Sequence, residues 1–208
     1  MRKPESSLGN MTITLVGVAV VSALLLAIVN HITKGAIEAQ AAIAAANGIN
    51  KAMGNDNLTE IDLNSIIQYN DDMEVTNYYE VHKMADARGN YGGAAVETTA
   101  MGFNGNIKVI VGFDADGKVA GYTILGMSET PGLGAKVSSW FQADGKGSII
   151  GKQMDTKKPL TLTKDGGDID GITASTITSR AFLNAVNKAY AAYTEEEVEA
   201  VTSASQQY

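Results

Sequence analysis

A cluster of hydroxyl side chains marks the predicted start of a helix near the C-terminal end of the chain. Residues 170–182 read DGITASTITSRAF, and the hydroxyls are those of Thr173, Ser175, Thr176, Thr178 and Ser179. One hydroxyl is enough to cap a helix. A helix start also exposes unpaired N–H groups and a partial positive charge, which together suit a phosphate group. The cluster therefore has two interpretations, a phosphate site or an N-cap by Ser175 or Thr176 with the other hydroxyls solvated.

The charge of this first turn favours the phosphate site. No Asp or Glu lies between Thr176 and Phe182, and the turn contains Arg180 instead. A cation at a helix start costs about 0.3–1 kcal/mol unless an anion is also present. Arg180 follows Thr176 by one turn and shares its face of the helix. We therefore expect the missing anion to be a bound phosphate.

A second segment with potential chemistry is the loop GMSETPGLGAK, residues 126–136. Pro131 fixes one φ angle, while Gly132 and Gly134 permit positive φ and let a planar ligand approach the backbone. The alternative is an ordinary surface turn after a strand.

The elements that position these two segments follow from hydrophobic periodicity. Strands are expected at 78–84, 94–103, 106–113 and 118–125, with the turn-rich segment 87–93 and the hairpin turn DADG, residues 114–117, between them. A helix is expected over 177–193, where apolar residues form one stripe. The predicted fold class is α+β, with a twisted antiparallel sheet and flanking helices.

The N-terminal part predicts a membrane anchor. Residues 11–29 contain no charge and would span roughly 28 Å as a helix, which matches a bilayer core. A cleaved signal peptide is the alternative, although its apolar stretch is usually shorter. Arg2 and Lys3 precede the span and place the N-terminus in the cytoplasm. We expect a cytoplasmic N-terminus over 1–10, a single transmembrane helix over 11–30, a helical neck over 31–75 and an extracytoplasmic domain over 76–208.

Composition excludes several classes of function. The net charge is −7 and the pI about 4.8, so nucleic acid is not an expected partner. The chain has no cysteine and two histidines, which excludes thiolate-bound iron–sulfur clusters and argues against haem or structural zinc. No metal site and no catalytic residue are expected, so any redox chemistry must come from an organic cofactor.

The segment Asp170-x-x-Thr173-Ala174-Ser175-Thr176 resembles the attachment sequence of covalently flavinylated membrane proteins, Asp-x-x-(Ser/Thr)-Gly-Ala-Thr. In that family FMN is joined by a phosphoester to the last threonine, which corresponds to Thr176. The chain departs from the pattern at Ala174 and Ser175, and Ser175 adds a competing hydroxyl. The loop Glu129-Thr-Pro-Gly-Leu-Gly134 resembles one shared by the G subunit of the Rnf ion-translocating electron-transport complex and the C subunit of the sodium-translocating NADH:quinone reductase. The short distance between anchor and sheet favours the Rnf protein.

This resemblance implies a role for each site residue. Thr176 would carry covalent FMN, Thr178 and Arg180 would hold its phosphate, and Asp170 would serve recognition by the flavin transferase that attaches FMN. The remaining candidates for cofactor binding are Glu129, Thr130, Gly132, Leu133, Gly134, Lys136, Thr173 and Ser175.

The resemblance also implies a function and partners. The protein would be an electron-carrying flavoprotein subunit in a bacterial inner-membrane complex that links ferredoxin and NAD to ion translocation, with its C-terminal domain on the periplasmic side. Its partners would be the other subunits and a flavin transferase. The alternatives are the C subunit of the quinone reductase and a membrane-anchored binding module without a redox role.

Overall fold

The computed structural model describes residues 8–55, 57–69 and 75–194. Within them, the principal elements are the helices α1 (Leu8–Met53), α2 (Val137–Trp140) and α3 (Thr176–Thr194), the strands β1 (Thr59–Tyr69), β2 (Val75–Ala85), β3 (Tyr91–Met101), β4 (Asn106–Asp114) and β5 (Val119–Gly126), and the 3-10 turns η1 (Gly134–Lys136) and η2 (Thr163–Asp165). The chain divides into two compact units, Met1–Ala44 and Ala45–Tyr208.

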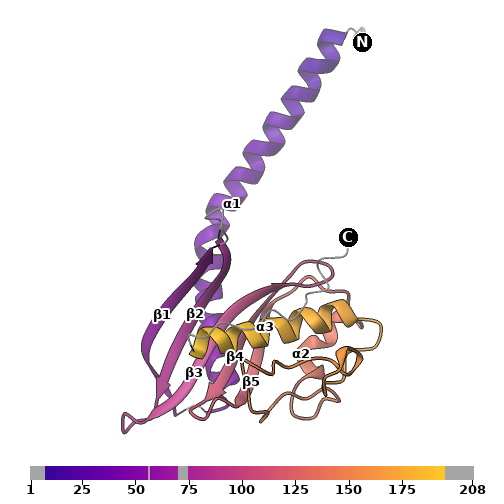
Figure 1. Cartoon of the computed structure of the whole chain (residues 1–208). Coiled ribbons are helices and arrows are strands. Elements are labelled where there is room, and N and C mark those ends of the chain that lie inside the picture. Colours follow the sequence, from indigo (N-terminus) through magenta and orange to yellow (C-terminus); the bar gives the residue numbers. More distant parts are fainter. Residues whose placement is uncertain (1–7, 56, 70–74, 195–208) are drawn as a thin grey trace. The chain divides into compact units, whose positions relative to one another are not determined.

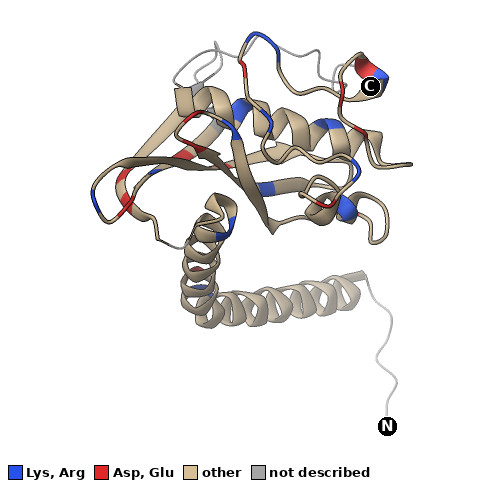
Figure 2. Cartoon of the chain, turned by 90° about the horizontal axis from the view of Figure 1, so that it is seen from below, with Lys and Arg blue, Asp and Glu red and all other residues tan. Residues whose placement is uncertain are grey.

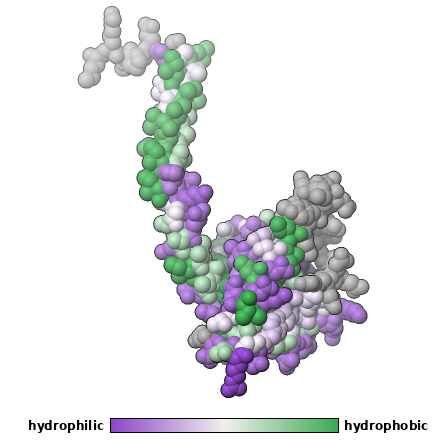
Figure 3. Space-filling view, turned by 90° about the vertical axis from the view of Figure 1, so that its left-hand side faces the viewer, coloured by the Kyte–Doolittle hydropathy of each residue, from purple (hydrophilic) through white to green (hydrophobic). Residues whose placement is uncertain are grey.

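The first unit contains most of α1, which is long and apolar enough to cross a membrane. Figure 2 shows no acidic or basic colour along its apolar stretch, and Figure 3 shows hydrophobic side chains on the visible face. The hydroxyls of Thr12, Thr14 and Thr33 donate to carbonyls four residues earlier, at 3.0, 2.8 and 2.8 Å. These polar groups are satisfied within the helix, as a lipid-facing helix requires.

The second unit is built on a five-stranded antiparallel meander in the order β1-β2-β3-β4-β5 (Figure 1). Strands β2 to β5 confirm the four strands expected from the sequence. The predicted DADG turn is also confirmed, because Asp114 N–H donates to the Lys118 carbonyl at 2.9 Å and Gly117 has a φ of 78°.

Helix α3 covers one face of the sheet and confirms the predicted C-terminal helix. Its Phe182 stacks on Phe141, with 4.7 Å between ring centroids, and packs against Tyr122 at the same distance. The Tyr122 hydroxyl donates to the Val137 carbonyl at 2.6 Å, so its burial leaves no hydroxyl proton unpaired. This aromatic cluster fixes α3 and α2 on the sheet.

The opposite face is partly covered by the end of α1. There Ile49, Ala52 and Met53 pack with buried side chains of β2, β3 and β4. At Gly112 a Cβ atom would lie 2.3 Å from the Ala52 carbonyl oxygen, so this contact between helix and strand backbones requires glycine.

The predicted helical neck is wrong over residues 59–69, which form β1. The sequence TEIDLNSIIQY combines a capping-like start with an apolar stripe, and these two features together favour a helix. In the structure these residues pair with β2, from Thr59 opposite Ala85 to Tyr69 opposite Val75. Ile66 reaches the core beneath α3, while its neighbour Ile67 is exposed on the other face. Pairing with β2 outweighs the weak local helix signal. Residues 70–74 of the expected neck lie outside the described part of the chain.

Candidate functional site

The segment that precedes α3 is held at several points by hydrogen bonds. The Ser179 hydroxyl accepts from Ile172 N–H at 3.0 Å and donates to the Ser175 carbonyl at 2.9 Å. Ser175 N–H donates to the Ile172 carbonyl at 3.0 Å. The segment thus forms a defined turn directly before the helix, and Ser179 supports this turn.

Ala174 occupies a conformation that favours glycine. Its φ of 61° makes it the only non-glycine residue with positive φ in the described part of the chain. A side chain in this left-handed region costs roughly 1–2 kcal/mol. The resemblance places a glycine at this position, and the backbone angle gives the physical reason.

The hydroxyl cluster is divided by burial. Thr178 and Ser179 are buried, and Ser175 is 8% exposed. Thr176 is half-buried at the first position of α3, and Thr173 is exposed in the preceding turn. Of the two adjacent candidates for attachment, Thr176 is therefore the more accessible.

Glu129 connects the two segments that were singled out in the sequence. Its Oε2 accepts a hydrogen bond from the Thr178 hydroxyl at 2.9 Å. Its Oε1 accepts from the backbone N–H groups of Phe103 at 2.7 Å and Asn104 at 3.2 Å. The residue is only 7% exposed. Glu129 therefore joins its own loop to the β3–β4 turn and to the first turn of α3.

Two glycines make room for this carboxylate. A Cβ atom at Gly134 would lie 2.4 Å from Glu129 Oε2 and 2.9 Å from Thr178 Oγ1, and one at Gly102 would lie 2.2 Å from Glu129 Oε1. Gly132 has the positive φ expected for it, at 77°. Gly134 does not have positive φ, and it is required by the close approach instead.

Arg180 already has an anionic partner. Its Nε donates to Asp165 Oδ2 at 2.8 Å, and a second guanidinium nitrogen binds the other carboxylate oxygen. The hydrogen bonds from Arg180 hold the pKa of Asp165 below its usual range. Asp165 thus supplies the negative charge that we expected from a phosphate, and the role of Arg180 toward a phosphate stays a prediction.

The other candidate residues lie around this centre. Three of them, Thr130, Leu133 and Lys136, are exposed in the loop 126–136. The Thr130 carbonyl accepts from the N–H groups of Leu133 and Ala135, both at 3.2 Å. Asp170 is exposed, and its carbonyl accepts from the Trp140 indole at 2.8 Å.

Sequence reasoning missed Phe103, Asp165 and the bond from Trp140 to Asp170. Phe103 is 67% exposed at the β3–β4 turn, and its N–H is bound to Glu129. The sequence signal that could have found it is the turn GFNG, residues 102–105, which places an aromatic residue between turn-forming residues. Nothing in the sequence links Asp165 to Arg180, because the chain between them has no regular period.

This arrangement fits a phosphate-bearing cofactor. The first turn of α3 contains no acidic side chain, and its first N–H groups have no acceptor within the helix. The N–H group of Ser179 in the same turn is already paired, since it donates to the carbonyl of Ser175, the residue before the helix, at 3.0 Å. A threonine hydroxyl at the first helical position, beside N–H donors, can carry a phosphoryl group in favourable electrostatic surroundings.

Comparisons with known proteins agree with this chemistry. Residues 102–191 match the model of the FMN-binding domain family. The G subunit of the ion-translocating oxidoreductase complex of Shewanella piezotolerans is 35% identical over 182 residues, which is 83% of each chain. The corresponding protein of Aliivibrio fischeri strain MJ11 is 39% identical over 126 residues, 57% of this chain and 58% of that protein. That of Shewanella oneidensis is 40% identical over 119 residues, 56% of each chain. Across these last two alignments, the chain spans little more than half the length of the relatives.

Proposed function

The chain belongs to the G-subunit family of the ion-translocating oxidoreductase complexes, and from this we propose that it relays electrons through an FMN covalently attached to Thr176. The complex would be membrane-bound, would link ferredoxin and NAD and would couple electron flow to ion translocation. Bound FMN would supply the acceptance and release of one or two electrons.

The observation that carries this proposal is the hydrogen bond between Glu129 and Thr178. It joins the loop 126–136 to the helix start that bears Thr176, although the two segments are far apart in the sequence. The two segments that carry the family resemblance are therefore neighbours in the fold, so both can contribute to one cofactor site. The FMN-binding family model also spans both segments.

Different residues of the chain would bind different parts of the FMN. N–H groups at the start of α3 would orient the phosphate, together with the hydroxyl of Thr176 as its covalent attachment point. Gly132 leaves open space beside the loop, since no atom lies within 4 Å of a Cβ built there. Lys136 is exposed two residues after Gly134, where a cation near the flavin would favour its reduced anion.

The proposal also states how the FMN is attached and on which side of the membrane the FMN domain lies. A flavin transferase that uses FAD and Mg²⁺ would form the ester, and the exposed Asp170 would take part in its recognition. Residues 11–30 would cross the bacterial inner membrane within α1, with the FMN domain on the periplasmic side. The other subunits of the complex would be its permanent partners.

The test is expression of the full chain with a flavin transferase, followed by denaturing electrophoresis under ultraviolet light. We expect a fluorescent band for the wild type and none for Thr176→Ala. Thr99→Ala is the matched control, because Thr99 is an exposed threonine on β3 that lies outside the attachment segment and the loop 126–136, and it should remain fluorescent. A colourless wild type in the presence of active transferase would instead support a binding module without a redox role.

A further inference from the structure

Strand β1 is the open edge of the sheet. At the other edge, β5 is bonded to a later segment: Val119 N–H donates to the Lys152 carbonyl at 3.1 Å, and Gly151 N–H donates to the Val119 carbonyl at 2.7 Å. Strand β1 pairs with β2 alone, and within residues 57–69 and 75–194 no other strand pairs with it. An 11-residue edge of this kind leaves backbone donors and acceptors available to another strand.

The sheet face beside this edge exposes large apolar side chains. Leu63 pairs with His82 and Ile67 with Tyr78, so these residues lie on one face, opposite the face that α3 covers. Leu63, Ile67 and Tyr78 are 51%, 42% and 46% exposed. The end of α1 covers only the part of this face near Met84, Ala95 and Ile110. The β1 side is turned toward the viewer in Figure 3, where hydrophobic and hydrophilic side chains alternate.

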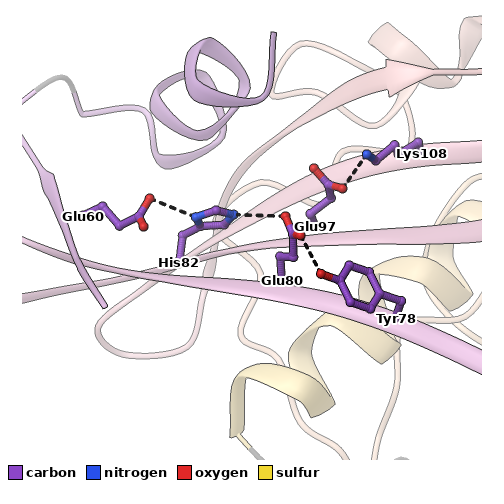
Figure 4. A network of polar contacts seen from close by, with 6 residues as sticks. All are labelled: Glu60, Tyr78, Glu80, His82, Glu97 and Lys108. Carbon is purple, nitrogen blue, oxygen red and sulfur yellow. Dashed lines mark hydrogen bonds and ion pairs between the residues drawn. The ribbon is translucent and has the colours of Figure 1, made fainter. Parts of the chain in front are cut away.

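The same face carries an excess of negative charge (Figure 4). Glu80 and Glu97 are direct cross-strand partners, a pairing of like charges that is unfavourable by itself. Glu97 binds Lys108 at 2.6 Å, whereas Glu80 accepts from the Tyr78 hydroxyl at 2.7 Å and lies 3.9 Å from His82. A third carboxylate, Glu60, lies 2.9 Å from the other nitrogen of His82.

We propose that the outer edge of β1 and this face bind an extended, basic segment of another protein as an added strand. Backbone hydrogen bonds to β1 would give affinity, and alternate side chains would give specificity. Apolar side chains of the segment would cover Leu63 and Ile67, and Lys or Arg side chains would face Glu60 and Glu80.

The negative charge of this face favours a basic segment over two other possible occupants, a membrane surface and a second copy of the chain. An anionic membrane surface would be repelled by the carboxylates, and a second copy of the chain would bring the same net charge of −7. The register shift between Glu60 and Asp62 is a bulge that interrupts the start of the edge. A second register shift lies between Gln68 and Tyr69, so the regular part available for pairing is residues 62–68.

The test uses the purified full chain in detergent and two fluorescent peptides, one alternating Val and Lys and one alternating Val and Glu. We expect the Val–Lys peptide to bind and to slow hydrogen exchange of the β1 amides. Leu63→Lys and Ile67→Lys should each weaken its binding about tenfold. Ala143→Lys is the matched control, because Ala143 is exposed in the loop that follows α2 and not on this sheet face, and its binding should equal that of the wild type.

A second pair of variants isolates the charge. Glu80→Gln keeps an acceptor for Tyr78 and should weaken binding, whereas Asp144→Asn removes an exposed carboxylate in a distant loop and should not. The proposal is overturned if the Val–Glu peptide binds equally well, if neither peptide protects β1, or if the chain forms a dimer that Leu63→Lys dissociates. None of these measurements requires the flavin, so their outcome is independent of the proposed function.

Discussion

The hydroxyl of Thr178 donates to the buried carboxylate of Glu129 across 2.9 Å, between residues that are 49 positions apart in the chain. The same carboxylate binds two backbone N–H groups of the β3–β4 turn. One side chain thus holds together its own loop, the β3–β4 turn and the first turn of α3, which begins at Thr176. The arrangement makes Glu129 a positioning residue, because its oxygens already have partners within the protein.

Two replacements of Glu129, by Ala and by Gln, should separate the contribution of its hydrogen bonds to stability from that of its charge. Glu129→Ala leaves three buried or half-buried donors without their acceptor and should lower the free energy of unfolding by about 2–4 kcal/mol. Glu129→Gln keeps one acceptor oxygen for the two N–H groups and an amide for Thr178, so it should cost less than half as much. Denaturant unfolding of the full chain in detergent, followed by the fluorescence of the single tryptophan, measures both. Equal losses for the two variants would contradict this account.

Gly134→Ala should disturb the same contact from the other side. The added Cβ would lie 2.4 Å from Glu129 Oε2 and 2.9 Å from Thr178 Oγ1. Such overpacking typically costs about 1–3 kcal/mol, and displacement of the first turn of α3 should also slow flavin attachment. Gly126→Ala is the control, since no atom lies within 4 Å of a Cβ there and its stability should be unchanged or slightly higher.

Ala174→Gly should stabilise the protein. It relieves the cost of a side chain at a φ of 61°, and part of this gain is offset by the greater freedom of glycine in the unfolded chain. We expect a net gain of about 0.5–1 kcal/mol in the same unfolding measurement. Ala143→Gly serves as the comparison, because Ala143 is exposed and does not have positive φ. A loss of stability in both variants would show that Ala174 is not strained.

The contact between Asp165 and Arg180 should make a small contribution to stability that depends on pH. Arg180 lowers the pKa of Asp165 in the folded state. The contribution is therefore present above the ordinary carboxyl pKa of about 3.9 and is lost as the pH falls through the lower folded value. Since both side chains are partly exposed, Asp165→Asn should cost no more than about 1 kcal/mol at pH 7. Unfolding curves of the variant and the wild type should converge once the pH has fallen below the lowered folded pKa of Asp165, and a constant difference would exclude this linkage.

The elements with a strong period could be predicted from the sequence. The strands from β2 to β5 are bounded by turn-rich segments, DADG marks their last hairpin, and the stripe of small and aromatic residues in α3 has helical spacing. Strand β1 was missed because its threonine and acidic residues imitate a helix cap, while its strand character depends on pairing with β2.

The candidate site was predicted as two separate segments, and their connection was not. Glu129 was expected to lie near the flavin, but its burial against Thr178 follows from the packing of α3 on the sheet. The anion near Arg180 proved to be Asp165, which comes from an irregular loop whose path no local pattern determines. Gly134 was expected to have positive φ, as Gly132 does; this is wrong for Gly134, where close packing against Glu129 and Thr178 is what requires glycine.

The central claim is tested most directly by locating the flavin on the chain. Trypsin cleaves after Lys164 and Arg180, so one peptide, residues 165–180, contains every hydroxyl of the cluster. After expression with a flavin transferase, the mass of this peptide should rise by that of FMN less one water, and fragmentation should place the addition on Thr176. An unmodified peptide, or an addition on the neighbouring Ser175, would contradict the account.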